Sequence, residues 1–186
     1  MLICFLDTET TGLEIGDHRI IEFYGRLIET DTWADKGTLF QRFNPMRSIM
    51  PAAQAVHHIS ATDLLHEPTW EKASAPVHAF ISSADAWVAH NGVGFDFPFL
   101  DYEFNRAGLP ALNSQLRIDT MTDARWATPN GKVPNLGELC FACGVSYDTT
   151  KAHAAQYDVD CMTECFRLGA TWGFYELPVI EKALAA

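Results

Sequence analysis

Two carboxylates one residue apart follow the first apolar run of the chain. Residues 2–6, Leu-Ile-Cys-Phe-Leu, lead directly into Asp7 and Glu9. A short continuous apolar run predicts a buried strand, and alternation along a strand places both acids on one face near its carboxyl end. Two acids there repel each other unless a cation lies between them, and hard cations such as Mg²⁺ take oxygen ligands. Alone, the pattern fits a metal site and a solvated strand end equally well.

Two later segments combine histidine with an acid. In the first, His90-Asn91 precedes Asp96 at the expected start of a helix, where the helix dipole favours a carboxylate in any case. In the second, His153 precedes Asp158, which lies early in the last expected helix. Taken singly, each segment also has a plain structural explanation, an acid in a first helical turn or a solvated pair.

The pattern of apolar residues predicts the elements that position these clusters. Apolar and β-branched runs are typical of strands, and apolar residues three or four apart are typical of helices. The expected strands cover residues 2–9, 19–28, 37–43, 86–91 and 116–120, and the expected helices cover residues 69–81, 95–107, 135–143 and 153–169. This order predicts an α/β fold, a mixed sheet with helices on both faces.

Three residues are expected to shape the first two of these long helices. Thr69 is a plausible N-cap for the first, and Pro76 inside its apolar stripe predicts a break or a kink. Gly108 is expected to end the second helix as its C′ residue.

The composition fits one globular domain over residues 1–186. The net charge of −11 argues against a broad basic face for nucleic acid, although it leaves contact through bound metals open. No basic leader or membrane-length apolar run is evident, so neither a signal peptide nor a membrane partner is expected. The lack of such segments and the odd number of cysteines, five, together predict a cytoplasmic protein with reduced thiols.

Four of the cysteines form two closely spaced pairs. Cys140 and Cys143 make one pair, and Cys161 and Cys165 make the other. Such pairs can make a Cys₄ zinc site, but both lie in apolar, helix-like stretches where cysteine behaves as a small hydrophobic residue. Packing is therefore the favoured interpretation.

Taken together, the three acidic segments resemble the DEDDh (DnaQ-like) family of 3′→5′ exonucleases in the ribonuclease-H-like superfamily. The family pattern is a strand ending in D-x-E, a central H-N-x-x-F-D segment and a later H-x-A-x-x-D. The chain has D-T-E at 7–9, H-N and F-D within 90–96 with one extra residue between them, and H-A-A-Q-Y-D at 153–158. Similar stretches at 10–13, 44–45, 56–59 and 118–120 extend the resemblance over about residues 2–168.

The resemblance implies a fold, a reaction and a cofactor. The fold is a five-stranded sheet of order 3-2-1-4-5 with strand 2 antiparallel to the rest. The reaction is hydrolysis of a terminal phosphodiester of DNA or RNA with release of nucleoside 5′-monophosphates. Two divalent ions, Mg²⁺ with Mn²⁺ as a substitute, stabilise charge on the attacking and leaving oxygens.

Roles for individual residues follow from the same resemblance. The metal ligands are Asp7, Glu9, Asp96 and Asp158, with Asp7 bridging both ions. His153 is the general base, a role that suits histidine because its ordinary pKa of about 6.5 lies near neutral pH. The implied substrate contacts are Thr10, Leu13, His57, Asn91, Phe95 and Phe99. For Phe95 and Phe99, an i,i+4 pair, core packing is an equally good interpretation. His58 departs from the glycine frequent in relatives.

Several alternatives remain open on the sequence. A haloacid-dehalogenase-type phosphatase also begins with an acid pair after an apolar strand, but its second acid is usually Asp, whereas Glu9 stands here. A non-catalytic nucleic-acid-binding module would be favoured by loss of an acid or of the base, and all five positions are occupied. The sequence leaves undecided whether DNA or RNA is the substrate, with proofreading, repair or RNA processing as settings. It also leaves open association with a polymerase or with a second copy of the chain.

Overall fold

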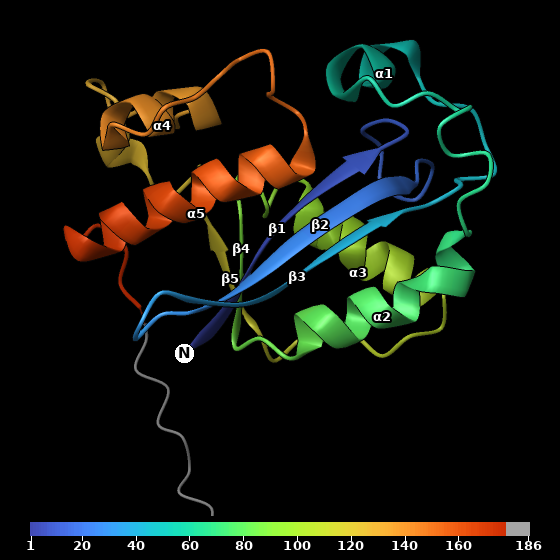
Figure 1. Ribbon diagram of the computed structural model, residues 1–186, viewed down its shortest axis with the longest axis horizontal. Coiled ribbons are helices and arrows are strands. Elements are labelled where there is room, and N and C mark those ends of the chain that lie inside the picture. Colours follow the sequence, from blue (N-terminus) through green and yellow to red (C-terminus); the bar gives the residue numbers. More distant parts are fainter. Residues whose placement is uncertain (178–186) are drawn as a thin grey trace, which may run out of the picture.

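A five-stranded mixed sheet forms the centre of the protein. In the computed structural model, residues 1–177 are described, and the strand order is β3-β2-β1-β4-β5 (Figure 1). The strands are β1 (Leu2–Thr10), β2 (Ile20–Glu29), β3 (Ala34–Arg42), β4 (Ala86–Ala89) and β5 (Leu116–Asp119). Strand β2 is antiparallel to β1 and β3, whereas β1, β4 and β5 are parallel. The predicted strand order and the antiparallel second strand are therefore confirmed.

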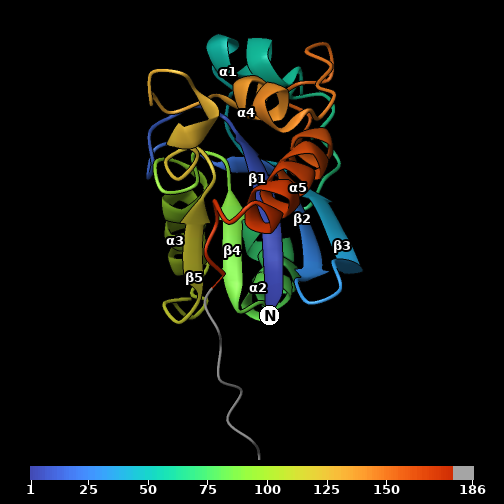
Figure 2. The same cartoon turned by 90° about the vertical axis from the view of Figure 1, so that its left-hand side faces the viewer.

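Helices cover both faces of this sheet (Figure 2). The helical elements are α1 (Pro51–His57), α2 (Trp70–Ser82), α3 (Asp96–Arg106), the 3₁₀ turn η1 (Arg125–Ala127), α4 (Leu136–Cys143) and α5 (Ala155–Thr171). Helices α2 and α3 pack on one face, and α4 and α5 pack on the other. Within residues 1–177, no helix is both long and apolar enough to cross a membrane.

Strand β1 divides the core into its two layers. Ile3 and Phe5 belong to the layer with α4 and α5, and Cys4 and Leu6 belong to the layer with α2 and α3. All four side chains are fully buried, which explains why the strand reads as a continuous apolar run. Because side chains alternate, the strand turns its next odd-numbered side chains toward the α5 side.

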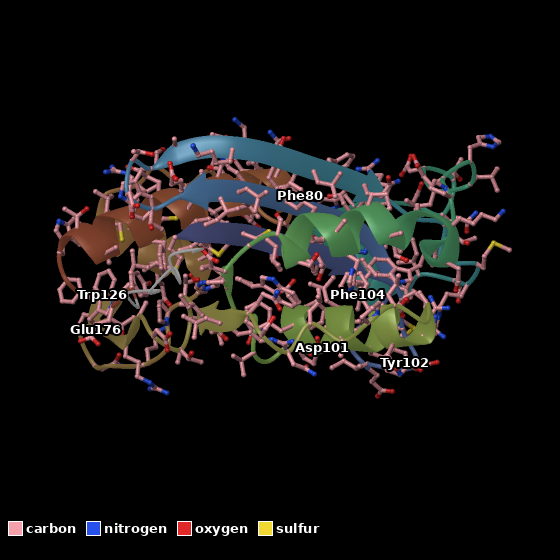
Figure 3. All side chains as sticks on the ribbon, turned by 90° about the horizontal axis from the view of Figure 1, so that it is seen from below. Phe80, Asp101, Tyr102, Phe104, Trp126 and Glu176 are labelled. Carbon is pink, nitrogen blue, oxygen red and sulfur yellow. The ribbon has the colours of Figure 1, made fainter. Side chains whose placement is uncertain are left out.

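The layer of α2 and α3 is packed closely enough to require a glycine in β2. A Cβ on Gly25 would lie 2.8 Å from the ring of Phe23 and 2.9 Å from that of Phe80, which projects from α2 (Figure 3). The two helices are joined through Trp70, whose indole N–H donates to the Glu103 carbonyl at 2.9 Å. Its ring centroid lies 5.4 Å from that of Phe104 on α3.

Three local expectations are corrected by the structure. Helix α2 runs through Pro76 as one element, because Trp70, Val77 and Ile81 bury the same stripe on both sides of the proline. Thr69 occupies the N-cap position, but its side chain makes no capping hydrogen bond. The last helix begins at Ala155, so His153 lies in the loop before it.

Other local expectations are confirmed. Gly108 follows the end of α3 with a φ of 72°, as a C′ residue does. All five cysteines are free and buried, and the two pairs lie in α4 and α5 as packing residues. The sulfurs of Cys140 and Cys165 lie 3.6 Å apart across the contact between these helices.

Candidate active site

The end of β1 brings two acids to the face of the sheet that carries α5. Asp7 is paired with Tyr24 and Glu9 with Glu22 on β2, so Glu22 is a third carboxylate on this face. The register of the strands shifts between Glu9 and Thr10. Such an irregularity ends regular pairing and re-aims the chain at the edge of a site. Arg42 on β3 donates to Glu22 at 2.6 Å, so that carboxylate is held by a cation.

Asp96 reaches this site from the first turn of α3. The main-chain N–H of Thr8 donates to its Oδ1 at 3.0 Å, and the Thr8 hydroxyl donates to the same oxygen at 2.7 Å. The Asp96 side chain is thereby fixed beside the strand that carries Asp7 and Glu9. Only 2% of Asp96 is exposed.

Asp158 reaches the site from the first turn of α5. Its Oδ2 accepts the main-chain N–H of His153 at 2.8 Å, and its Oδ1 accepts the Tyr147 hydroxyl at 3.0 Å. His153 adopts a left-handed φ of 62°, and its side chain is exposed. The short loop before α5 therefore joins the predicted base and a predicted metal ligand through one hydrogen bond.

Burial raises the pKa values of all four predicted metal ligands, and repulsion by the other carboxylates adds to the rise at Asp7 and Glu9. The pKa of Asp7 lies well above its ordinary value because of burial first and then the charges of Asp96, Glu9, Asp158 and Glu22. Burial, with Glu22 as the nearest charge, raises the pKa of Glu9 to about 9. Burial raises the pKa of Asp96 to about 7 against the hydrogen bonds from Thr8, and it also raises that of Asp158.

These four carboxylates fit a hard divalent cation by their chemistry. They offer only oxygen ligands, and a cation would relieve the repulsion that raises their pKa values. Within residues 1–177, however, no three His, Cys, Asp or Glu side chains lie close enough to make a ready-made metal site. Asp96 is held toward Thr8, and Asp158 toward Tyr147 and the His153 N–H.

A cavity of about 520 Å³ opens beside Asp7, which we call the active-site cavity. Its wall includes Asp7, His153, Asp158, Tyr147, His90 and Asn135. Glu9 and Asp96 are almost fully buried and do not form part of this wall. The size is typical of a site for a small molecule or a nucleotide.

The predicted substrate contacts fall into exposed and buried groups. Leu13 is 79% exposed in the loop after β1, and Asn91 is exposed in the loop after β4. Thr10 is buried, and its hydroxyl donates to the Gly12 carbonyl at 2.6 Å. His57 is also buried, and its Nδ1 accepts the Ile59 N–H at 3.0 Å.

The two predicted aromatic contacts differ in their surroundings. Phe95 is half-buried at the start of α3, and its ring centroid lies 4.9 Å from that of Phe99. Phe99 is fully buried in the layer of α2 and α3. Its prediction as a substrate contact is therefore wrong, because the i,i+4 pair turns its inner member into the core.

Some residues of the site were not predicted. The register of β1 and β2 places Glu22 beside Glu9. The sequence predicts that these two strands are neighbours, but it does not give their register. Asp119 at the end of β5 accepts the N–H groups of Asn91 and Val93, each at 3.0 Å, and so fixes the loop before α3. Tyr147 has no sequence signal, because it lies in an irregular segment outside the three acidic motifs.

Comparison with known proteins decides the family of the chain. The Exonuclease family, RNase T type, matches residues 4–166, which include all four acids and His153. The chain belongs to this exonuclease family. The predicted DnaQ-like family and the predicted enzyme class, 3′→5′ exonuclease, are thereby confirmed. Divalent metal ions are normal cofactors of the family.

Relatives of this exonuclease chain include bacterial DNA polymerase III proteins. It is 30% identical over 190 residues to the DNA polymerase III subunit epsilon of Haemophilus influenzae, covering 96% of this chain and 72% of the relative. It is 26% identical over 163 residues to the PolC-type DNA polymerase III of Mycoplasma genitalium. That match covers 86% of this chain but only 11% of the much longer relative.

The fold of the exonuclease domain is also found in solved structures. Escherichia coli Exonuclease I in complex with a dT13 oligonucleotide superposes with a TM-score of 0.78 at 18% sequence identity. The match covers 91% of this chain and 41% of Exonuclease I. The ribonuclease-H-like fold is thus shared with an enzyme crystallised on single-stranded DNA.

Proposed function

We propose that this chain removes nucleotides from the 3′ end of single-stranded or frayed DNA and releases nucleoside 5′-monophosphates. The observation that carries the proposal is the gathering of four carboxylates from β1, α3 and α5, two of which, Asp7 and Asp158, line the active-site cavity together with His153. Family membership supports the reaction, and the polymerase relatives support DNA as the substrate. Their names also support a proofreading setting, in which a polymerase presents the 3′ end.

The proposed ligands of two Mg²⁺ ions, with Mn²⁺ as a substitute, are Asp7, Glu9, Asp96 and Asp158. When bound, the ions supply positive charge that stabilises the attacking and leaving oxygens of the phosphodiester. Asp7 is the proposed bridging ligand, since its pKa responds to all three of the other acids. Thr8 and Tyr147 hold Asp96 and Asp158 in place through their hydrogen bonds.

His153 is the proposed general base, which takes a proton from the attacking water. Its ring lies on the open side of the active-site cavity, where water has access. Its main-chain N–H is bonded to Asp158, so the ring and a proposed metal ligand keep a fixed relation. Leu13 and Asn91 are the proposed contacts of the terminal nucleotide, because both are exposed at the same open end of the sheet.

The test is a product assay on single strands carrying a label in their 3′-terminal nucleotide. With Mg²⁺, we expect release of labelled nucleoside 5′-monophosphate and faster turnover of DNA than of RNA. Asp7→Ala should abolish turnover, and His153→Ala should lower kcat by about 10²–10⁴-fold, the usual range for loss of a general base. Asp31→Ala and His66→Ala are matched controls, since both side chains are exposed outside the site.

Absence of product from the wild-type chain at saturating protein would contradict the enzymatic function and leave a nucleic-acid-binding module. Faster turnover of RNA would make the chain an exoribonuclease. Unchanged turnover in His153→Ala would remove that residue from its proposed role.

A further inference from the structure

A second hollow, of about 550 Å³, lies next to the active-site cavity; we call it the α4 groove. One side is formed by α4 and the residues after it, and the other by residues 127–132. The groove and the active-site cavity share four wall residues, Asn135, Gly137, Tyr147 and Thr149. The two hollows are therefore adjacent along these four residues, close enough for one extended ligand to contact both.

The α4 groove has a wall suited to a nucleobase. Phe141 lines it from α4 and is 88% exposed, more than any other large apolar side chain of residues 1–177. Pro129, Val145 and the Tyr147 ring add further apolar surface. An aromatic ring left open to solvent in a concave site can stack a base of any identity.

The groove also contains one basic side chain. Lys132 lies on its wall and pairs with Glu138 at the start of α4. Both side chains are well exposed, so this pair is weak and can exchange for a phosphate. An apolar platform beside a lysine matches the two parts of a nucleotide, the base and the backbone.

The position of the groove indicates which nucleotide it would take. The loop after β1, which carries Leu13, lies next to the start of α1, because the Met50 N–H donates to the Thr11 carbonyl at 2.9 Å. Helices α1 and α4 lie on opposite sides of the view in Figure 1. The phosphodiester that is cut must lie at the proposed metal ligands. A strand whose terminal nucleotide contacts Leu13 therefore continues past Asp158 toward Tyr147 and the groove.

We propose that the α4 groove binds the nucleotides that precede the terminal one, with the Phe141 ring as a stacking platform for their bases. This inference rests on the proposed exonuclease function, whose site it extends. The occupant is the single-stranded part of the same substrate. The groove thus sets how many nucleotides the chain holds while it cuts one.

The test compares a long and a minimal substrate. The long substrate is a 12-nucleotide single strand, and the minimal one is the p-nitrophenyl ester of thymidine 5′-monophosphate, which has no preceding nucleotide. Phe141→Ala should lower kcat/KM on the 12-mer roughly tenfold through KM, because loss of one base–aromatic stack has about that effect. Hydrolysis of the ester should stay within about twofold, since no contact to it is lost.

Two further variants separate stacking from other effects. Phe141→Tyr keeps a stacking ring and should restore kcat/KM on the 12-mer. Phe40→Ala removes another exposed ring, 52% exposed, from the edge strand β3, outside both hollows, and should leave both substrates unaffected. A second measurement follows the binding of a labelled 12-mer and of thymidine 5′-monophosphate to His153→Ala chains in Mg²⁺, in which turnover is slow. Adding Phe141→Ala should weaken only the binding of the 12-mer.

The possible outcomes distinguish this inference from the function on which it rests. Loss of activity toward both substrates to the same extent, or no effect on the 12-mer, would overturn the role of the groove while the exonuclease stands. A wild-type chain that cuts neither substrate would overturn the proposed function, and the binding measurement would still decide whether Phe141 holds the strand.

Discussion

The carboxylates around Asp7 hold unfavourable electrostatic free energy in the metal-free protein. Their raised pKa values mean that the folded chain binds protons more tightly than the unfolded chain does. This contribution to stability is therefore fully present at low pH, below the ordinary pKa of a carboxylate. It is lost as pH rises through about 7, the pKa of Asp96, and about 9, the pKa of Glu9.

Removing the charge of Asp7 should therefore stabilise the metal-free protein at high pH. We expect Asp7→Asn to raise the free energy of unfolding at pH 8 by on the order of 1–2 kcal/mol, with a smaller gain at pH 5, where the raised pKa already keeps the wild-type carboxyl protonated. Mg²⁺ should stabilise the wild type more than the variant. Urea unfolding at both pH values, in EDTA and in Mg²⁺, measures these differences.

Asp31→Asn, at an exposed position, is the control and should change stability little at either pH. A loss of stability in Asp7→Asn at pH 8 would mean that the carboxylate makes favourable contacts that outweigh the repulsion.

Individual site residues were predictable where their chemistry has a fixed spacing. The four acids and His153 were proposed because three short segments resemble the motifs of the exonuclease family, in which these residues keep a set spacing. Tyr147 and Glu22 were missed, since their contacts with Asp158 and Glu9 arise from tertiary structure and strand register. Phe99 was misassigned because a helical pair gives no indication of which ring points inward.

Among the elements, α5 must be held on the sheet for Asp158 to meet Asp7 and Glu9. Arg26 of β2 provides a polar tie. Its Nε donates to Asp35 of β3 at 2.8 Å, and another guanidinium nitrogen donates to Asp160 of α5 at 3.0 Å. Asp160 lies only two residues after Asp158, so the tie acts on the turn of α5 that carries the proposed ligand.

Loss of this tie should weaken metal binding as well as the fold. Arg26→Ala should raise the half-saturating Mg²⁺ concentration a few-fold while lowering the free energy of unfolding by about 1 kcal/mol, since the pairs are partly exposed. Mg²⁺ titrations of turnover and urea unfolding measure the two effects. Arg167→Ala breaks an ion pair to Glu164 within α5 and should leave the Mg²⁺ requirement unchanged. If the two variants have the same half-saturating Mg²⁺ concentration, Arg26 has no positioning role.

The succession of elements was predictable because each one carries its own hydrophobic period. The boundaries of the elements were harder to predict. Strand β3 begins at Ala34, earlier than its apolar residues indicate, because pairing with β2 extends it. Helix α2 continues through Pro76 because tertiary packing outweighs the local cost of a proline.

For the whole molecule, the net charge of −11 determines how a nucleic acid can be held. Few lysines and arginines are available to displace counterions from the phosphates, so the affinity for a single strand should depend only weakly on monovalent salt. With His153→Ala chains in Mg²⁺, we expect a slope of log K against log [salt] no steeper than about −2. Replacing Mg²⁺ by EDTA should abolish binding. Fluorescence anisotropy of a labelled 12-mer measures both, and a steep slope with binding in EDTA would indicate a basic face instead.

Three side chains around the open end of the sheet stand on left-handed backbone. His58, Asn91 and His153 have φ values of 59°, 67° and 62°. Glycine adopts this conformation with less strain, so a library selected only for heat resistance would accumulate glycine at all three positions. At His58 that exchange would remove no proposed site residue, whereas at Asn91 and His153 it would delete a proposed substrate contact and the proposed general base. Selection for stability and selection for turnover therefore favour different residues at Asn91 and His153.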